Sequence, residues 1–246
     1  MTRLNDILYN GLVPRLIAGD ADGISLWIFI ALCAVGGIIA YLLGGLNFAI
    51  IISKYKFKED IRTYGSGNAG MTNMLRTYGK AAAAFTLLGD MAKAMLSVII
   101  GTLLAGESGA YIAGLCCVIG HSFPCYYGFK GGKGIVVTAA MLLCLEPVVF
   151  LILLVIFVLL VASTKYLSLG SIIGMMLYPV LLNRLYMPLN GMNEGAVVAI
   201  VSVLNTLLVV WLHRENLKRL WNGTENKFSL KKKDKFKKDE KKSDEE

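Results

Sequence analysis

The chain has 246 residues, of which 56% are hydrophobic and 17% charged, with a formal net charge of +8 and a mean hydropathy of +0.61. Residues 214–246 hold 12 of the 25 Lys/Arg and 8 of the 17 Asp/Glu, so the rest of the chain carries too few charges to cover a water-soluble fold. This composition excludes a disordered chain, a disulfide scaffold and an ordinary soluble enzyme. The basic residues lie at the edges of apolar segments and in the tail, which argues against nucleic-acid binding.

Seven apolar segments predict an all-α polytopic membrane protein, because crossing the hydrocarbon core takes about 20 apolar helical residues. In chain order they cover residues 24–53, 81–104, 111–127, 135–145, 148–163, 169–186 and 195–212. The fourth is too short to cross the membrane alone, so it either completes a short crossing or re-enters from one side.

Basic residues predict the orientation of these segments. Residues 54–80, 128–134, 164–168 and 214–246 hold 21 of the 25 Lys/Arg, and seven alternating segments place all four stretches on one side. Since Lys and Arg favour the cytoplasmic side, we expect the N-terminus outside and the C-terminus in the cytoplasm.

These boundaries predict four regions, the second of which contains two long cytoplasmic loops. Residues 1–23 form an extracytoplasmic extension without the features of a signal peptide, and residues 24–213 form the transmembrane domain. Two long cytoplasmic loops cover residues 54–80 and 120–134. Residues 214–225 form a cytoplasmic segment, and residues 226–246 a Lys-rich tail that we expect to be disordered and solvated.

The first of three polar clusters combines glycines with a hydroxyl and a guanidinium. It contains Gly65, Ser66, Gly67, Asn68, Gly70, Thr72, Asn73 and Arg76. Its G-x-G-x-x-G pattern does not indicate a Rossmann fold, because no strand precedes it. Glycines nevertheless let backbone N–H groups approach an anion, and a helix beginning near Thr72 would direct its positive end there. The alternative is a glycine-rich turn whose Arg76 reaches the membrane interface.

The second cluster places lysines among glycines at the start of the short fourth segment. It contains His121, Lys130, Gly131, Gly132, Lys133 and Gly134. A Walker A loop is excluded because Tyr127 and Gly134 occupy positions that need Gly and Ser or Thr. The cluster can still form an anion-binding nest, or a flexible loop whose lysines only set the orientation.

The third cluster begins where the last segment leaves the membrane. His213 and Asn216 are three residues apart and share a helix face, which could point toward the first two clusters. The alternative is an ordinary basic stretch beside the membrane. Within the second segment, Asp90 and Lys93 are also three apart, and we interpret them as a structural ion pair.

Metal chemistry is not expected. Outside the tail, the cytoplasmic loops contain only Glu59 and Asp60 as acids, whereas a paired-metal phosphotransferase needs several converging carboxylates. The five cysteines lack paired CxxC spacing and there are only two histidines, so we expect no metal site and no cofactor.

Together, the clusters resemble the three motifs of the bacterial integral-membrane acyl-phosphate:glycerol-3-phosphate acyltransferases, the PlsY family. Residues 65–80, 120–134 and 213–225 resemble its first, second and third motifs, and residues 168–171 also fit. The resemblance extends from about Tyr41 to Glu225. It leaves out residues 1–23 and the Lys-rich tail.

The resemblance implies transfer of an acyl group from acyl phosphate to the 1-hydroxyl of glycerol 3-phosphate. The products are lysophosphatidic acid and phosphate, in the first step of phospholipid synthesis. It also implies a bacterial cell membrane, an active site facing the cytoplasm, and membrane lipid but no obligate protein partner around the enzyme.

The resemblance further assigns residues to this site. Ser66 and Arg76 correspond to an essential pair, His213 and Asn216 to an active polar pair, and Glu225 to a structural support. Lys133 and its neighbouring glycines belong to the glycerol-phosphate site. Candidate substrate-binding residues are Gly65, Gly67, Asn68, Gly70, Thr72, Asn73, His121, Lys130, Gly131, Gly132, Gly134 and Ser171.

Two questions stay open at this stage. The general base is either His213 or a phosphate oxygen of the substrate, with Ser66 orienting substrate in the latter case. A small transporter or lipid-handling protein for phosphorylated solutes is the alternative function. Against it, the polar groups gather at one face rather than near the midplane, where transporter sites usually lie. A noncatalytic interaction protein would leave the three glycine-rich motifs unexplained.

Overall fold

The computed structural model describes residues 11–18, 25–185 and 195–228, and within these ranges every long element is a helix. The helices are α2 (Leu12–Ala18), α3 (Leu26–Gly45), α4 (Phe48–Phe57), α5 (Met71–Tyr78), α6 (Lys80–Ser122), α7 (Ile135–Leu145), α8 (Pro147–Thr164), α9 (Leu167–Leu185), α11 (Gly195–Leu212) and α12 (Arg214–Trp221). Two short 3₁₀ helices cover Ile61–Thr63 and Cys125–Tyr127. The calls on residues 1–10, 19–23 and 229–246 lie outside the described residues.

Five helical stretches are long and apolar enough to cross a membrane. They are Leu26–Phe57, Lys80–Tyr127, Pro147–Thr164, Leu167–Leu185 and Gly195–Leu212, with α7 as a shorter apolar helix of 11 residues. The prediction of an all-helical membrane protein is therefore confirmed. The count of seven crossings stays a prediction.

The second and third predicted segments are the two arms of α6. Ala105 (φ −148°, ψ 30°) and Gly106 (φ 62°, ψ −150°) interrupt the helical backbone, and beyond them the chain turns back. A methyl group added at Gly101 would lie 2.7 Å from the Cβ of Ala113, although a straight helix would separate these residues by about 18 Å. The two arms thus lie antiparallel and pack closely through small residues.

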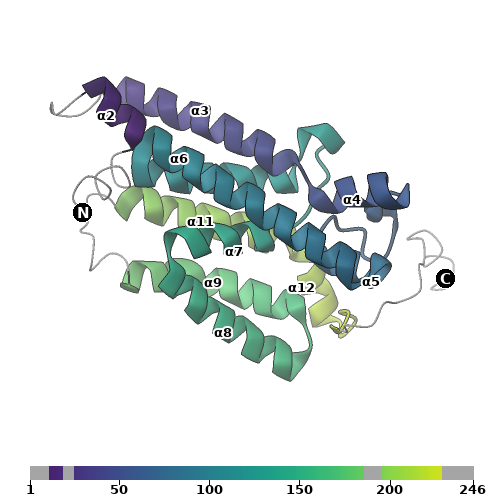
Figure 1. Cartoon of the computed structure of the whole chain (residues 1–246). Coiled ribbons are helices and arrows are strands. Elements are labelled where there is room, and N and C mark those ends of the chain that lie inside the picture. Colours follow the sequence, from purple (N-terminus) through teal and green to yellow (C-terminus); the bar gives the residue numbers. More distant parts are fainter. Residues whose placement is uncertain (1–10, 19–24, 186–194, 229–246) are drawn as a thin grey trace.

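The first predicted segment, residues 24–53, corresponds to the apolar stretch Leu26–Phe57, inside which the structure breaks the helix at Leu46 and Asn47. The Asn47 side chain caps α4 by accepting a hydrogen bond from the backbone N–H of Ile50 at 3.2 Å. Asn is a favoured N-cap residue, so a second helix begins here. This second helix, α4, carries the chain away from the axis of α3 (Figure 1).

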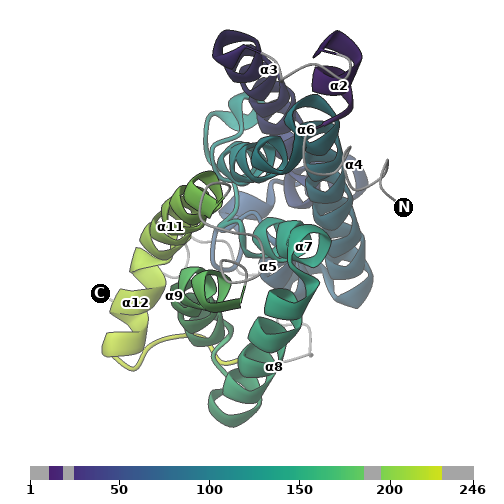
Figure 2. The same cartoon turned by 90° about the vertical axis from the view of Figure 1, so that its left-hand side faces the viewer.

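The long helices form one bundle, and the short helices α4, α5 and α12 gather at one of its ends (Figure 1). Viewed along the bundle, α7 lies among α6, α8, α9 and α11 (Figure 2), and its Val137, Ala140 and Met141 belong to the main hydrophobic core. Because α7 is short and central, the loop before it lies inside the bundle, between the ends of the helices that surround α7.

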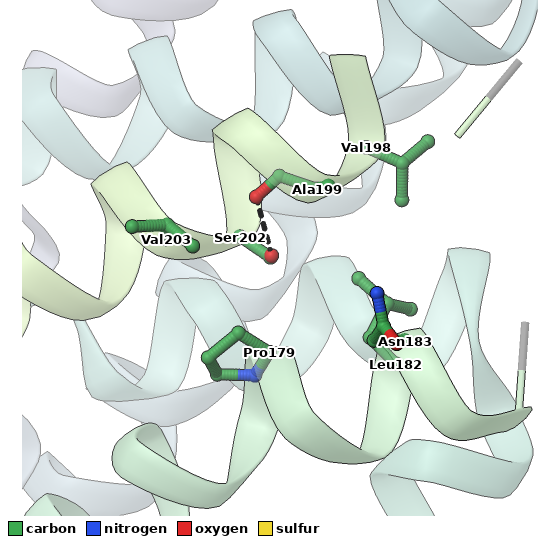
Figure 3. A pocket seen from close by; sticks show the side chains of 7 residues that line it. All are labelled: Pro179, Leu182, Asn183, Val198, Ala199, Ser202 and Val203. Carbon is green, nitrogen blue, oxygen red and sulfur yellow. Dashed lines mark hydrogen bonds between the residues drawn. The ribbon is translucent and has the colours of Figure 1, made fainter. Parts of the chain in front are cut away.

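The opposite end of α9 and α11 holds a small cavity of about 90 Å³, lined by Pro179, Leu182, Asn183, Val198, Ala199, Ser202 and Val203 (Figure 3). Pro179 has no N–H for the carbonyl one turn earlier, and the hydroxyl of Thr206 donates to that carbonyl, on Met175, at 2.9 Å. The Ser202 hydroxyl is likewise satisfied by the carbonyl of Ala199. This cavity contains no charged side chain and lies away from all three polar clusters.

Candidate active site

Three basic side chains from different elements interact electrostatically with one carboxylate at the end of the bundle where the short helices gather. Arg76 lies on α5, Lys133 in the loop before α7, and Arg219 on α12, while Glu225 follows α12. We call Arg76, Lys133 and Arg219 the cation cluster. Arg219 and Glu225 affect the pKa values of both Arg76 and Lys133, so all four charges share one electrostatic environment.

Glu225 accepts three hydrogen bonds, which join α9 and α12 at this site. Its Oε1 accepts from the Ser168 hydroxyl of α9 at 3.0 Å and from the Asn216 amide of α12 at 2.8 Å. Its Oε2 accepts from Arg219 Nε at 2.8 Å. Although burial opposes ionisation, these donors hold the pKa of Glu225 below its usual range, so its carboxylate is charged at neutral pH.

Lys133 is joined to the third motif by a hydrogen bond. Its ammonium donates to Oδ1 of Asn216, whose own amide donates to Glu225. Burial, together with the positive charges of Arg219 and Arg76, lowers the pKa of Lys133 to about 8. A partly desolvated lysine of this kind gains when an anion binds, because the anion restores the balance of charge.

Arg76 is half-buried and makes no hydrogen bond or ion pair with the residues that the structure describes. Its guanidinium has five donors, stays charged at every physiological pH and matches a phosphate in a planar, bidentate geometry. Three cations around one buried carboxylate leave the site with excess positive charge, which suits phosphate groups.

His213 lies at the junction of α11 and α12 and is buried. Its Nδ1 lies 2.8 Å from the Val209 carbonyl, and because a carbonyl can only accept, we assign the proton to Nδ1 and a lone pair to Nε2. Burial and the nearby Lys133 lower the pKa of His213 to about 4. The imidazole is therefore neutral at pH 7 and can accept a proton at Nε2.

Many polar groups of the first glycine-rich loop form hydrogen bonds within the loop itself. Asn73 is buried, accepts from the backbone N–H of Ser66 at 3.1 Å and donates to the carbonyls of Ile61 and Tyr64. The N–H groups of Gly67 and Gly70 bond to carbonyls within the same loop. The expected helix begins at Met71, next to Thr72, with Gly70 as its N-cap.

Other predicted residues of this loop have a more open position. The side chain of Ser66 is exposed, whereas Asn68 and Thr72 are half-exposed. Gly65 and Gly67 have positive φ values of 56° and 70°. At Gly65 this conformation brings the backbone against the Asn73 side chain, where a Cβ would collide with Oδ1.

The second glycine-rich loop is held against the end of α6. The N–H groups of Gly131 and Gly132 donate to the carbonyls of Ser122 and His121 at 3.0 and 3.1 Å, and a Cβ on either glycine would collide with His121. Gly134 (φ 80°) forms the N-cap of α7. This close approach fixes the backbone on both sides of Lys133.

Arg62 contacts the second glycine-rich loop from its outer side and stabilises it. Its guanidinium donates to the carbonyls of Tyr127 and Lys130 at 2.7 and 3.0 Å and forms an ion pair with Asp60 at 2.7 Å. The hydrogen bonds from Arg62 lower the pKa of Asp60. The Lys130 side chain itself is exposed.

His121 belongs to a buried polar cluster beneath the loops rather than to the cation cluster. The predicted Asp90–Lys93 ion pair is confirmed, at 2.8 Å. The Lys93 ammonium also lies 3.0 Å from His121 Nδ1 and donates to the carbonyls of Gly44 and Leu46. Those carbonyls are at the C-terminus of α3, where helical partners are missing and a cation is favoured.

Four of the five predicted catalytic residues meet in this site: Arg76, Lys133, His213 and Asn216 are linked by contacts or by mutual electrostatic effects. The fifth, Ser66, has no described contact that joins it to them. Ser171, chosen from the resemblance, donates its hydroxyl to Leu167 of its own helix. Ser168, one turn earlier, is the serine that joins the network.

Three residues that make contacts at this end received no site role from the sequence: Arg219, Ser168 and Arg62. The role of Arg219 could have been predicted by asking which basic residue pairs with Glu225, since the two lie six residues apart. Nothing in the sequence indicates that Arg62 contacts residues 127 and 130. Among the described residues, no group of three or more His, Cys, Asp or Glu could hold a metal ion.

A half-buried, cationic site at the end of a bundle of membrane-length helices is typical of an integral-membrane protein that handles anionic substrates at the lipid–water boundary. Residues 34–223 match the family model described as "Glycerol-3-phosphate acyltransferase". The chain belongs to this family, as its three motifs predict.

Relatives named glycerol-3-phosphate acyltransferase support this assignment. Those from Clostridioides difficile (strain 630) and Pseudomonas fluorescens (strain Pf0-1) are 43% and 44% identical. The alignments cover 79% and 78% of this chain and 95% and 97% of the relatives.

Two crystal structures of "PlsY (YgiH), an integral membrane glycerol 3-phosphate acyltransferase" are also similar. The glycerol 3-phosphate form has a TM-score of 0.72 and 30% identity, and the lysophosphatidic acid form a TM-score of 0.70 and 28% identity. Each match covers 80% of this chain and 96% of the other.

Proposed function

We propose that this chain transfers a fatty acyl group from acyl phosphate to the 1-hydroxyl of glycerol 3-phosphate, giving lysophosphatidic acid and phosphate. The observation that carries the proposal is the cation cluster, in which Arg76, Lys133 and Arg219 share a single buried carboxylate. Both substrates carry phosphate, and bringing them together requires positive charge that neutralises their mutual repulsion.

The chain would cross a bacterial cell membrane seven times, with the site facing the cytoplasm. The excess of Lys and Arg in the loops at the end where the site lies supports this orientation. A site at the membrane edge lets the acyl chain stay in lipid while its phosphate enters the water-exposed end of the bundle. The fatty chain then never has to be lifted into water.

Arg76 and Lys133 would hold the phosphate groups, and Asn216 would orient the Lys133 ammonium. The 1-hydroxyl oxygen attacks the acyl carbonyl carbon, the bond from that carbon to the phosphate oxygen breaks, and phosphate leaves with the electron pair. The hydroxyl proton passes to a substrate phosphate oxygen, whose second pKa near 6 suits this transfer, or to Nε2 of His213. No cofactor or metal is needed.

Ser66 would orient substrate rather than form an acyl-enzyme. The Ser66 side chain is exposed, and the chain offers no described hydrogen bond from its hydroxyl to a histidine. The kinetics should therefore be sequential. Ping-pong kinetics, or a stable acyl adduct on Ser66, would contradict this part of the mechanism.

The deciding experiment incubates the purified protein in vesicles with labelled glycerol 3-phosphate and, in parallel, long-chain acyl phosphate, acyl-CoA or acyl carrier protein. Lysophosphatidic acid should form with acyl phosphate alone. If another donor is used, the proposed donor is wrong. If no donor gives product, transport of a phosphorylated solute becomes the leading function.

Replacing Arg76 tests the site itself. Arg76→Ala should lower kcat/KM by about 10² to 10³, the loss typical of removing one preorganised electrostatic donor. Arg214→Ala is the matched control, since Arg214 lies on α12 with its guanidinium over the exposed Trp211 ring and takes no part in the proposed chemistry. Normal turnover by correctly inserted Arg76→Ala protein would remove Arg76 from the site.

A further inference from the structure

A buried polar network lies beneath the two glycine-rich loops and takes no part in the chemistry proposed above. It consists of Asn47, Asp90, Lys93 and His121, each of which is at most 4% exposed. These residues come from the break between α3 and α4 and from both arms of α6. Burying polar groups is costly unless they are hydrogen-bonded, so the bonds of this network indicate what it holds in place.

All three donors of the Lys93 ammonium are used. They reach the carbonyls of Gly44 and Leu46 at 2.8 and 3.0 Å and Nδ1 of His121 at 3.0 Å. Because an ammonium can only donate, Nδ1 of His121 accepts, and we assign the ring proton to Nε2. Asp90, 2.8 Å from the same ammonium, balances its charge. Lys93 therefore fixes the orientation of the His121 ring.

Asn47 connects this network to the first glycine-rich loop. Its Oδ1 accepts from the N–H of Ile50 and its Nδ2 donates to the carbonyl of Ala69 at 3.1 Å, which fixes the orientation of the amide. The same Nδ2 lies 3.5 Å from Nδ1 of His121. Ala69 is fully buried and lies two residues before α5, the helix that carries Arg76. The hydrogen bond from Asn47 thus anchors the chain where it enters α5.

His121 connects the same network to the second glycine-rich loop. Its backbone carbonyl accepts from the N–H of Gly132 at 3.1 Å. A Cβ added to Gly132 would collide with the His121 ring and would lie 2.7 Å from the carbonyl oxygen of Ala69. The two loops therefore meet at Ala69 and Gly132, against the His121 ring, and Lys133 is the next residue along the chain.

We propose that Asn47, Lys93 and His121 are positioning residues that hold the two glycine-rich loops at a fixed separation. Arg76 follows the first loop and Lys133 lies in the second, so this separation sets how far apart the two cations hold their phosphate groups. If the loops shift, each cation can still bind an anion, but the reacting atoms lose their alignment, and about 1 Å of misplacement can cost about 10² in rate. The proposal rests on the proposed function and adds the residues that set its geometry.

Replacing His121 tests this role, because Asn offers an acceptor near the position of Nδ1 and Leu offers none. His121→Leu should lower kcat about 10- to 100-fold, while the Kd for glycerol 3-phosphate, measured by calorimetry, should stay within about threefold of the original value. His121→Asn should restore kcat to within about threefold. A residue that only stabilises the fold would leave kcat unchanged once it is normalised to the protein that binds glycerol 3-phosphate. An unchanged kcat in His121→Leu, or a loss confined to glycerol 3-phosphate binding, would overturn the proposal.

Asn47→Ser tests the connection to the first loop and applies even if His121→Leu does not fold. Serine is as good an N-cap as asparagine, so α4 keeps its cap, whereas the shorter side chain leaves the Ala69 carbonyl without its donor. Asn47→Ser should lower kcat about tenfold, and Asn47→Ser/His121→Leu should lose little more than His121→Leu alone, because the two residues act in one network. Asn183→Ser, at the opposite end of α9, is the control. An active enzyme in which the two losses multiply in full would overturn the single network and leave the proposed function standing.

A distance measurement gives a readout that does not need activity. In a variant whose five native cysteines are replaced, spin labels at Ser66→Cys and Lys130→Cys, both exposed positions, report the separation of the two loops by electron paramagnetic resonance. His121→Leu should broaden the distance distribution, and His121→Asn should leave it narrow. If the loops respond in this way but no donor gives lysophosphatidic acid, the network is supported and the proposed function fails. A distribution that neither His121→Leu nor Asn47→Ser changes would overturn the proposal whether or not the protein is active.

Discussion

The pKa of Lys133 is determined by the residues that surround it in the fold rather than by its neighbours in the sequence. It is partly buried, bonded to Asn216 and surrounded by the positive charges of Arg76 and Arg219. These surroundings lower its pKa to about 8. The site is therefore arranged so that the lysine is most stable as an ammonium when an anion is bound.

This depressed pKa predicts a pH dependence for glycerol 3-phosphate binding. Below pH 8 the free protein keeps Lys133 protonated. As the pH rises above 8 the ammonium is lost, so the Kd for glycerol 3-phosphate should rise, approaching tenfold per pH unit. Because bound phosphate raises the lysine pKa again, binding at pH 8.5 should take up a proton, measurable by calorimetry in buffers of different ionisation enthalpy.

Lys133→Arg is the matched control for this titration, because arginine stays charged throughout the range. Glycerol 3-phosphate itself is fully ionised above pH 8, since its second pKa is near 6. Proton uptake that persists in Lys133→Arg would place the titrating group elsewhere. A Kd that does not change between pH 7 and 9.5 would contradict the depressed pKa of Lys133.

At the scale of elements, the buried cluster around Lys93 connects the membrane helices to the loops that form the site. Lys93 on α6 caps the end of α3 through the carbonyls of Gly44 and Leu46. It also contacts His121, whose backbone carbonyl accepts from Gly132. One ammonium thus links two helices and the second glycine-rich loop.

Lys93→Met should lower the free energy of unfolding by about 3 to 5 kcal/mol, because it leaves the Asp90 carboxylate buried without its partner. The measurement is thermal unfolding of the purified protein in detergent. Removing both charges in Asp90→Leu/Lys93→Met should recover part of this loss. If the double variant is no more stable than Lys93→Met, the two residues do not act as a pair.

Gly106 sets the turn that separates the two arms of α6. Its backbone (φ 62°, ψ −150°) lies in a region that only glycine adopts readily. Gly106→Ala should therefore destabilise the hairpin by about 1 to 3 kcal/mol, seen as a lower unfolding temperature. Gly174→Ala is the control, because a Cβ there meets no atom within 4 Å. Equal unfolding temperatures for the two variants would show that the turn tolerates a side chain.

Hydropathy predicted the apolar elements well because the bilayer requires long apolar helices. It could not predict the break at Asn47, since the residues on both sides are apolar and only the capping geometry interrupts the helix. The hydropathy pattern also divided the region of α6 into two segments, because Glu107 interrupts the apolar run. It did not show that Gly106 makes a tight turn there.

The site was less accessible to prediction. Glycine-rich spacing and the resemblance together found Arg76, Lys133, His213 and Asn216, which the structure links through one hydrogen bond and through electrostatic effects. The same reasoning selected His121 and Asn73 as substrate contacts, but both are buried and bonded to protein groups. A motif indicates that a residue matters at a site, and only the fold shows whether its side chain faces the substrate or supports the backbone.

At the scale of the whole molecule, charge and polarity divide the bundle into two unequal ends. The short helices α4, α5 and α12 gather at one end (Figure 1), and the cation cluster comes from α5, α12 and the loop before α7. The other end of α9 and α11 holds the small cavity beside Ser202, whose described lining residues are all uncharged (Figure 3). A protein that gathers its cations at one membrane edge fits chemistry between a lipid substrate and a water-soluble one.

The same asymmetry predicts the orientation, which thiol labelling can test. In a variant whose five native cysteines are replaced, Ser25→Cys should report the N-terminal end of α3, and Trp221→Cys, at a position that is 92% exposed, the end of α12. A membrane-impermeant maleimide applied to spheroplasts should label Ser25→Cys alone, because the Lys- and Arg-rich end faces the cytoplasm. Permeabilised cells should be labelled at both positions, which controls for accessibility. Labelling of Trp221→Cys in intact spheroplasts would place the cation cluster outside the cell and contradict its access to cytoplasmic glycerol 3-phosphate.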